Sequence, residues 1–225
     1  MSTLYVIATP IGNLGDITFR AVETLKNVDV ILCEDTRTTR KLLNHFSINT
    51  DTMSYHVHSK LSKIDKILSL LEEGKNIALV SDAGTPTISD PGILLIQKVK
   101  ETLPDIKVVS IPGPSAVIAA LSISGLPASE FIFLGFLPHK KGRETLFKEI
   151  AKNERTTVFY ESPHRIMKTL DSLEKFMPER RVVIARELTK IYEEVIGGTP
   201  TEVKEFLKNN EEKIRGEFVV LVNGK

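Results

Sequence analysis

Short runs of apolar and β-branched residues alternate, along the first half of the chain, with segments whose apolar residues recur every three or four positions. The runs are typical of buried strands, and the segments of amphipathic helices. The pattern predicts strands at Leu4–Ala8, Val28–Cys33, Asn76–Ser81 and Val108–Ile111, separated by helices at Ile17–Lys26, Thr38–Phe46, Ser62–Glu73 and Pro91–Leu103. This alternation indicates βαβ crossovers and a mainly parallel sheet with helices on both faces.

A break at Ile111-Pro112-Gly113-Pro114 ends this series, because proline and glycine continue neither a strand nor a helix well. Beyond it, a helix is expected from Pro163 to Phe176, and Arg181–Ala185 and Tyr192–Ile196 are close enough to form a hairpin. Further strands are expected at Phe131–Leu134, Thr156–Tyr160 and Glu217–Val222. We therefore predict two α/β domains: residues 1–111 with a mainly parallel sheet, a linker and helix start at 112–118, and residues 119–225 with a mixed sheet.

Three Asp/Ser/Thr-Pro pairs predict helix starts with proline at the first helical position: Asp90-Pro91, Ser162-Pro163 and Thr199-Pro200. Thr199 is followed three residues later by Glu202, which adds a capping-box pattern.

The composition is that of an ordinary globular protein, with 225 residues, 41% hydrophobic and 26% charged. No apolar run approaches the roughly 20 residues of a membrane span, and the start of the chain lacks the parts of a signal peptide. Cys33 is the single cysteine, so we expect a cytoplasmic protein without disulfides. The formal net charge of +1 excludes a basic nucleic-acid footprint over the whole chain, but not a local one.

Ligands of open parallel sheets bind beyond the carboxyl ends of the strands. Four strand ends here carry loops rich in glycine, proline and small polar residues, which allow a ligand to approach the backbone closely. These loops are Thr9–Asp16, Glu34–Arg37, Asp82–Gly92 and Pro112–Ala116. One such loop is an ordinary strand-to-helix turn, but four in register predict a binding site.

Several ligand classes lack their motifs. There is no G-x-G-x-x-G after the first strand and no G-x-x-x-x-G-K-[ST], so pyrophosphate binding is not supported. No metal-ligand spacing occurs, since His56 and His58 lack acidic or thiolate partners and better suit surface or substrate contact. A G-x-S-x-G nucleophile elbow is also missing. An adenosine-like or amino-acid-like ligand, held mostly by backbone groups, remains.

The loop sequences themselves resemble a known family. Pro10-Ile11-Gly12-Asn13-Leu14, Glu34-Asp35-Thr36-Arg37, Ser81-Asp82-Ala83-Gly84-Thr85-Pro86 and Pro112-Gly113-Pro114-Ser115-Ala116 closely resemble the tetrapyrrole-methylase-like superfamily of class III S-adenosylmethionine methyltransferases. Within it they resemble the bacterial 16S ribosomal RNA cytidine 2′-O-ribose methyltransferases. The second half matches through Gly135-Phe136-Leu137-Pro138, Phe159-Tyr160-Glu161-Ser162, His164-Arg165, Ala185-Arg186-Glu187-Leu188-Thr189-Lys190 and Gly216-Glu217. One segment departs from the family: His56-Val57-His58-Ser59-Lys60 replaces the usual His-x-His-Asn-Glu.

The resemblance implies S-adenosylmethionine bound in a cleft between two α/β domains, and a homodimer. It carries over the cofactor contacts Pro10, Ile11, Gly12, Asp82, Ala83, Gly84, Thr85, Ile88, Ser89, Ser115, Ala116, Phe136, Leu137, Pro138, Leu188, Thr189, Gly216 and Glu217. No metal is expected.

The implied reaction moves a methyl group from a sulfonium to a ribose 2′-hydroxyl, which must lose its proton. The candidate catalytic carboxylates are Glu34, Asp35, Glu161 and Glu187, and Arg37, Lys140 and Arg165 could hold phosphates or polarise the hydroxyl. An equally supported alternative is that Arg186-Glu187 and Glu161-Arg165 are ion pairs that brace the two domains.

The segment His139-Lys140-Lys141-Gly142-Arg143 places fixed positive charges beside the expected cofactor contacts. Arg37, Lys140, Lys141 and Arg143 are therefore the candidate contacts to RNA phosphates. A solvated loop that opens the helix Glu144–Ile150 is the simpler alternative. Because the net charge is so small, we expect the substrate to be the small ribosomal subunit, with a splayed nucleotide, rather than naked 16S RNA.

Two other functions remain open. One is C-methylation of a tetrapyrrole or corrinoid precursor, which would favour an apolar trough over the lysines. The other is a noncatalytic nucleotide-binding assembly factor, because a fold alone does not fix a function.

Overall fold

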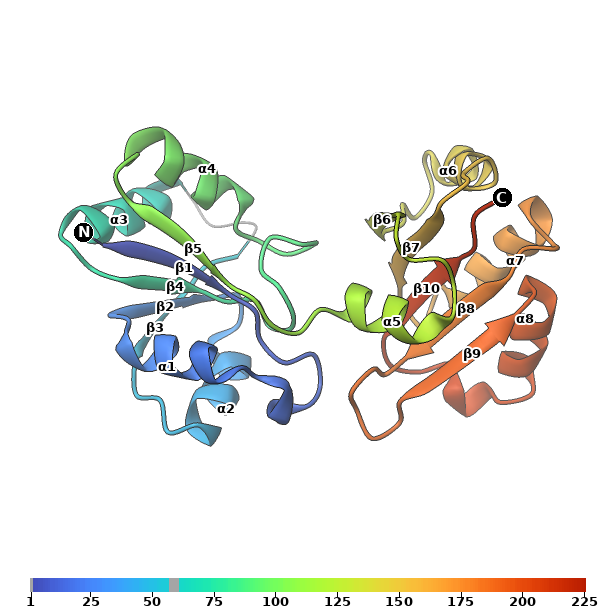
Figure 1. Ribbon diagram of the computed structural model, residues 1–225, viewed down its shortest axis with the longest axis horizontal. Helices are drawn as coiled ribbons and strands as arrows, with labels where there is room; N and C mark the ends of the chain where they lie inside the picture. Colours follow the sequence, from blue (N-terminus) through green and yellow to red (C-terminus); the bar gives the residue numbers. More distant parts are fainter. Residues whose placement is uncertain (1, 57–60) are drawn as a thin grey trace. The chain divides into compact units, whose positions relative to one another are not determined.

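The computed structural model describes residues 2–56 and 61–225, and the chain divides into two compact units, Met1–Ser115 and Ala116–Lys225 (Figure 1). The division lies inside the segment 112–118 expected as a linker, whose own bounds stay a prediction. His58, Ser59 and Lys60, with the departure from the family pattern, lie outside the described residues. None of the helices in the described ranges combines the length and apolar character that a membrane span requires.

The first unit is a parallel sheet between helices, as the periodicity predicts. Its elements are β1 (Thr3–Ile7), α1 (Phe19–Asn27), β2 (Val30–Cys33), α2 (Thr36–His45), β3 (Asp51–Ser54), α3 (Leu61–Glu72), β4 (Ile77–Leu79), α4 (Ile93–Thr102) and β5 (Lys107–Ile111), with a 3₁₀ turn at Leu14–Asp16. The strands pair in the order β3-β2-β4-β1-β5, and every pairing is parallel. Leu4 of β1, for example, lies between Ile77 and Val108.

The strand β3 is absent from the predicted set. It is four residues long, contains only one large apolar residue, Met53, and lies at the edge of the sheet. A short polar edge strand has no buried apolar run, so hydrophobic patterning does not detect it. Its presence shows that the four loops do not follow four consecutive strands of the chain.

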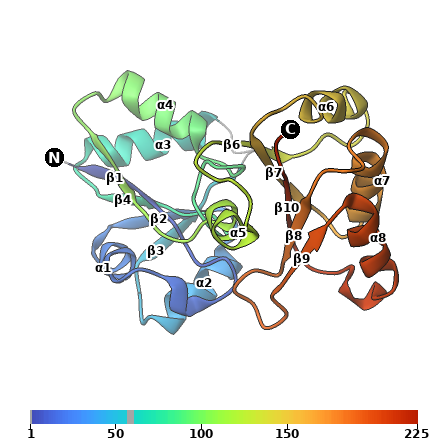
Figure 2. The ribbon, with the colours of Figure 1, turned by 45° about the vertical axis from the view of Figure 1, so that its right-hand side comes forward.

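Two hydrophobic cores lie on the two faces of this sheet. Helices α1 and α2 cover one face, where Ala21, Leu25 and Leu43 pack against Ile31 and Ile111. Helices α3 and α4 cover the other face, and both views show this three-layer arrangement (Figure 1, Figure 2). The buried strands therefore carry apolar residues on both sides, as strands between two helical layers must.

The second unit has a mixed sheet. Its elements are α5 (Ala116–Ser124), β6 (Phe131–Phe136), α6 (Arg143–Ile150), β7 (Thr156–Glu161), α7 (Ile166–Phe176), β8 (Val182–Arg186), β9 (Glu194–Gly198), α8 (Pro200–Lys208), a 3₁₀ turn at Glu211–Lys213 and β10 (Phe218–Val222). The order is β6-β7-β10-β8-β9, in which β6 and β7 are parallel and the other pairs antiparallel. The hairpin β8–β9 and the mixed sheet are confirmed.

The core of the second unit lies between the sheet and the helices α6, α7 and α8. Phe147, Phe159 and Phe218 are fully or almost fully buried in it. The strand residues of β10 that face away from this core are also buried, and α5 lies against β8 and β10 (Figure 2).

Two of the three predicted helix starts are wrong, and both prolines precede the helix instead. Helix α4 begins at Ile93 after Gly92, and α7 begins at Ile166 after Arg165. In the second case the backbone N–H groups of Arg165 and Ile166 both donate to the carbonyl of Ser162, which forms a turn first. Thr199-Pro200 does start α8, with the expected reciprocal capping by Glu202.

Candidate functional site

The four glycine- and proline-rich loops follow β1, β2, β4 and β5, which are adjacent strands of the parallel sheet. Parallel strands end at one edge, so these loops gather there. Two of them are joined directly: the N–H of Thr9 donates to the carbonyl of Gly84 at 2.8 Å, and the N–H of Gly84 donates to that of Thr9 at 3.0 Å. The hydroxyl of Thr85 donates to the carbonyl of Pro114 at 3.3 Å. The sheet edge therefore brings the expected cofactor contacts of the first unit together.

The loop 82–92 has an unusual backbone. Gly84, Thr87, Ser89 and Gly92 have φ angles of 81°, 74°, 67° and 133°. A Cβ on Gly92 would lie 2.8 Å from the side chains of both Leu79 and Thr87, so only glycine fits there. Left-handed conformations of non-glycine residues such as Thr87 and Ser89 gather at ligand sites and switch regions.

Within this loop, the expected contacts differ in exposure. Asp82, Ala83, Ile88 and Ser89 are exposed, whereas Gly84 is buried. In the first loop Pro10 is buried and Gly12 is exposed. The exposed set offers backbone and small side chains to a ligand, and the buried set fixes the loop.

Asp82 and Asp35 join the loops after β4 and β2. The backbone N–H of Asp35 donates to Oδ1 of Asp82 at 3.1 Å. Asp35 also caps α2, and the side chain and backbone N–H of Arg37 both donate to its carboxylate, which lowers the pKa of Asp35 to about 2. The side chain of Arg37 is 88% exposed, although its guanidinium is held by Asp35.

Two other carboxyl groups at this sheet edge behave in the opposite way. Burial raises the pKa of Glu34, the charge of Asp82 raises it further, and His56 opposes the shift. Burial also raises the pKa of Asp90 to about 6, with a smaller contribution from the charges of Glu34 and Asp82 and an opposing hydrogen bond from Ser81. Of the two expected catalytic carboxylates in this unit, Glu34 has a pKa that is raised toward neutral pH, whereas the pKa of Asp35 is lowered.

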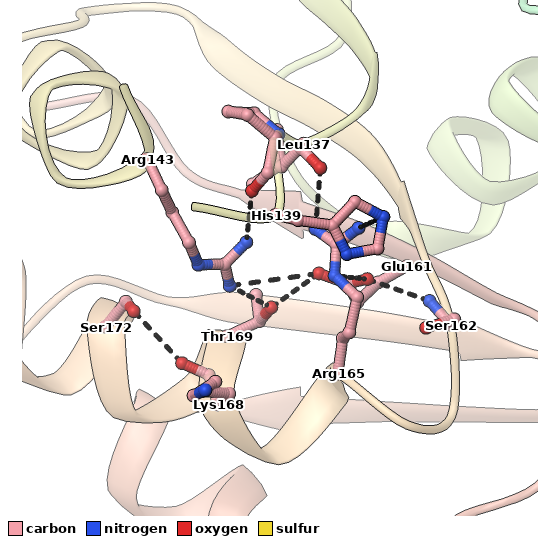
Figure 3. Close-up of polar contacts among 10 residues, drawn as sticks. Leu137, His139, Arg143, Glu161, Ser162, Arg165, Lys168, Thr169 and Ser172 are labelled. Atoms are coloured by element: carbon pink, nitrogen blue, oxygen red, sulfur yellow. Dashed lines mark hydrogen bonds and ion pairs between the residues drawn. The ribbon is translucent and has the colours of Figure 1, made fainter. Parts of the chain in front are cut away.

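In the second unit, Glu161 lies at the centre of a buried polar cluster (Figure 3). Its side chain is 0% exposed, and its Oε1 accepts from the backbone N–H of Ser162 at 2.9 Å and pairs with Nε of Arg165 at 3.2 Å. Its Oε2 accepts from the hydroxyl of Thr169 at 2.5 Å. The expected pair Glu161–Arg165 is present, and it lies inside one unit.

Both arginines of this cluster hold the segment that follows β6. Nη2 of Arg165 donates to the carbonyl of Leu137 at 2.6 Å, and Nη1 of Arg143 donates to that of Pro138 at 3.3 Å. The side chain of Arg143 is only 12% exposed, so its guanidinium serves the protein interior. Lys140 and Lys141, in contrast, are exposed on the same loop. Of the three residues of this unit that are expected to contact RNA, Lys140 and Lys141 are exposed and Arg143 is not.

Glu187 organises a second cluster in this unit. Nζ of Lys190 donates to Oε1 of Glu187 at 2.8 Å and to Oε2 of Glu217 at 2.9 Å, and the N–H of Glu217 donates to Oε1 of Glu187 at 2.9 Å. Burial acts to raise the pKa of Glu187, but these hydrogen bonds outweigh it and lower the pKa. Gly216 has a φ of 85°, and a Cβ there would collide with Glu187. This brings the expected contacts at 188–189 and 216–217 together.

The expected pairing of Arg186 with Glu187 takes a different form. Arg186 donates to the carbonyls of Arg215 and Tyr192 and lies 4.0 Å from Glu194, whereas Glu187 takes Lys190 as its partner. Both pairs lie in the second unit.

Thr169, Ser81 and Asp90 are site residues that sequence reasoning did not single out. Thr169 could have been noticed in the sequence, because it is a polar residue on the otherwise apolar face of α7 formed by Ile166, Leu170 and Leu173. Among the described residues, no three His, Cys, Asp or Glu side chains gather as metal ligands.

Comparisons with known proteins find a matching family and similar chains. Residues 3–204 match the family of Tetrapyrrole (Corrin/Porphyrin) Methylases. The chain is 50% identical over 224 residues to the ribosomal RNA small subunit methyltransferase I of Halalkalibacterium halodurans, across 99% of this chain and 76% of that protein. It is 51% identical over 223 residues to the protein of that name in Vibrio cholerae, across 98% of this chain and 77% of that one.

Among solved structures, a cobalt precorrin-4 methyltransferase of cobalamin biosynthesis superposes with a TM-score of 0.71. It covers 98% of this chain and 94% of its own, with 18% sequence identity. At that identity the likeness establishes the fold.

Proposed function

The chain belongs to the tetrapyrrole (corrin/porphyrin) methylase family, and we propose that it transfers a methyl group from S-adenosylmethionine to the ribose 2′-hydroxyl of a cytidine in 16S ribosomal RNA. The observation that carries the proposal is an identity of about one half, along the whole chain, to proteins named ribosomal RNA small subunit methyltransferase I. The loops at the sheet edge and the exposed lysines of the second unit support it. The protein is thus a methyltransferase, and the small ribosomal subunit is the proposed substrate.

The residues present fit S-adenosylmethionine. Oγ1 of Thr189 is buried without a hydrogen-bond partner among the described residues, so a polar ligand atom beside it would satisfy it. The exposed small residues of loop 82–92 leave backbone groups accessible to an amino-acid-like and adenosine-like molecule. When bound, this cofactor supplies a methyl group already activated on a sulfonium, so the protein has to align the acceptor oxygen and exclude water.

The proposed cofactor contacts are those carried by the family motifs. They are Pro10, Ile11, Gly12, Asp82, Ala83, Gly84, Thr85, Ile88, Ser89, Ser115, Ala116, Phe136, Leu137, Pro138, Leu188, Thr189, Gly216 and Glu217.

Glu34 is the best-suited acceptor for the proton that the ribose hydroxyl loses. A general base works best when its pKa lies near the working pH. The pKa of Glu34 is raised by burial and by Asp82, whereas the pKa values of Asp35 and Glu187 are lowered by their partners. Asp35, which follows Glu34 in the sequence, and its partner Arg37 then fix the backbone of the loop beside Glu34.

Lys140 and Lys141 are proposed as contacts to RNA phosphates. Both are exposed, and no hydrogen bond or ion pair occupies either side chain among the described residues. Phosphate contacts add affinity without reading sequence, so they suit a substrate whose shape selects the nucleotide. A homodimer, which the family implies, remains a prediction that light scattering of the purified protein tests.

A tetrapyrrole substrate is the second candidate, since the superposed cobalt precorrin-4 methyltransferase shares the fold. The 18% identity to that enzyme gives no support for its substrate, and the exposed lysines favour a polyanion.

Incubation of the purified protein with methyl-labelled S-adenosylmethionine separates these functions. Two substrates are offered in parallel: a precorrin, and small ribosomal subunits purified from cells that lack the methylating activity. We expect label in the 16S RNA of the subunits. Label only in the macrocycle would establish the tetrapyrrole reaction, and cofactor binding without label in either would establish a noncatalytic role.

A further inference from the structure

The buried cluster around Glu161 holds one stretch of backbone from two sides. One connection runs from Glu161 through Arg165 to the carbonyl of Leu137, with distances of 3.2 and 2.6 Å. The other runs from Glu161 through Thr169 and Arg143 to the carbonyl of Pro138, with distances of 2.5, 2.7 and 3.3 Å. Two consecutive carbonyls are therefore fixed by one carboxylate (Figure 3).

The same arginines also contact the next two residues. Nη1 of Arg165 lies 3.3 Å from Nε2 of His139, and the backbone N–H of Arg143 donates to the carbonyl of Lys140 at 3.3 Å. Leu137, at the start of the stretch, is 2% exposed and packs in the core. The loop is thus anchored at its first residue and tied along its length until α6 begins.

Stability does not explain this arrangement well. A fully buried carboxylate and two guanidinium groups lose their hydration, and apolar side chains of the same volume often give equal or higher stability. What the charged cluster adds is direction, because a guanidinium donates in a fixed planar fork. Lys140 and Lys141 follow the tied carbonyl of Pro138 by two and three residues, so the cluster fixes the backbone from which their side chains extend.

We propose that Glu161 is a positioning residue that acts through Arg165, and through Thr169 and Arg143, to aim Lys140 and Lys141 at the phosphates of the substrate. This rests on the proposed function, since it assumes that an RNA-containing substrate meets these lysines. It assigns Glu161, Arg143 and Arg165 no contact with the reacting atoms. Thr169 becomes the residue through which Arg143 is oriented, because its hydroxyl both donates to Glu161 and accepts from Arg143.

The test compares Thr169→Val, which removes the hydroxyl at nearly constant volume, with Thr169→Ser, which keeps it. Glu161→Gln is the stronger variant. Glu174→Gln is the control, because Glu174 lies on α7, the helix that carries Thr169, but pairs with Lys204 and Thr201 instead. Each is combined with the double variant Lys140→Ala/Lys141→Ala. The readouts are kcat/KM on small subunits, its dependence on salt concentration, and the melting temperature.

We expect Thr169→Val and Glu161→Gln to lower kcat/KM about tenfold, whereas Thr169→Ser and Glu174→Gln keep it. Each lost phosphate contact reduces the slope of log affinity against log salt by roughly one, so both lowering variants flatten the salt dependence as the lysine variant does. In the background without the two lysines, neither lowers kcat/KM further.

Three results would each overturn the proposal. They are a loss of kcat/KM that multiplies with the loss in the lysine variant, an unchanged salt dependence of kcat/KM, and equal losses of kcat/KM in Thr169→Ser and Thr169→Val. If Glu161→Gln does not fold, as its melting curve reveals, the Thr169 pair alone decides. A wild-type protein that does not methylate small subunits contradicts the proposed function instead, so the two failures are distinguishable.

Discussion

Thr9 and Gly84, which are 75 residues apart in the sequence, exchange two backbone hydrogen bonds of 2.8 and 3.0 Å. They join the loop after β1 to the loop after β4 in a single antiparallel bridge. Gly84 has a φ of 81°, so the bridge depends on a backbone conformation that residues with a side chain adopt poorly.

Gly84→Ala tests this bridge. Left-handed backbone costs an alanine about 1–2 kcal/mol, while its Cβ would meet Ile11 at an ordinary 3.5 Å. We expect the free energy of unfolding to fall by about 1 kcal/mol in a denaturant titration and the affinity for S-adenosylmethionine to fall with it in calorimetry. Gly74→Ala is the control, because Gly74 has a φ of 89° and open space around it. Equal cofactor affinity in the two variants would show that the bridge lies away from the cofactor.

Asp82→Ala should abolish cofactor binding. Asp82 is exposed and holds the loop after β2 through the N–H of Asp35, so its loss releases both loops. We expect the dissociation constant to rise at least about a hundredfold, equivalent to ~2.7 kcal/mol. Asp105→Ala, at an exposed aspartate before β5, provides the control in the same titration. An unchanged affinity in Asp82→Ala would mean that the cofactor binds elsewhere.

Glu34→Gln should remove the proton acceptor without removing the cofactor. A positioned general base contributes a factor of about 10²–10⁴, so kcat on small subunits should fall by about a hundredfold at unchanged cofactor affinity. Because the pKa of Glu34 is raised, activity of the wild type should increase with pH through a value above its ordinary 4.5. A rate profile of wild type and variant measures both, and an undiminished kcat in the variant would exclude Glu34 as the base.

Asp90 should make the protein less stable as the pH rises. Its pKa is near 3.8 when unfolded and about 6 when folded, because burial disfavours the charge. Between these values the folded state binds a proton that the unfolded state has lost, so the free energy of unfolding falls from pH 4 to pH 6. A pKa shift of this size in a fully buried group would correspond to ~3 kcal/mol, and the partial exposure of Asp90 reduces the expected effect to about 1 kcal/mol.

Denaturant titrations of Asp90→Asn at several pH values measure this effect. The variant should gain stability relative to the wild type between pH 4 and pH 7, by the same amount of about 1 kcal/mol. Parallel stability curves of the two proteins would show that Asp90 is not the group responsible.

The sequence predicts this fold well where burial dictates it. The predicted strands Val28–Cys33 and Glu217–Val222 contain the continuous apolar runs VILC and FVVLV, and the structure has β2 and β10 over those runs. The edge strand β3 was not predicted because none of its four residues is fully buried. The predictions of helix starts at Asp90-Pro91 and Ser162-Pro163 were wrong. The side chain of Asp90 bonds to Ser81 instead of capping a helix, and a turn at Ser162 precedes helix α7.

The candidate site divides in the same way. Loop motifs identify which residues gather at the sheet edge, because glycine and proline positions follow from backbone geometry. They do not reveal that Glu161 is fully buried or that Arg143 faces inward, since both depend on contacts of Thr169 on α7 with the end of β7 and the start of α6. Thr169 shows that a hydroxyl on an apolar helix face can indicate a buried polar partner.

Nucleoside mass spectrometry of 16S RNA shows directly whether the protein methylates a cytidine ribose. Small subunits from cells that lack the protein are treated with the purified protein and S-adenosylmethionine, then digested to nucleosides. We expect 2′-O-methylcytidine to increase after treatment with the wild type and to stay at its starting level with Asp82→Ala. An unchanged 2′-O-methylcytidine level after treatment with folded, cofactor-binding wild-type protein would show that the protein does not methylate this RNA.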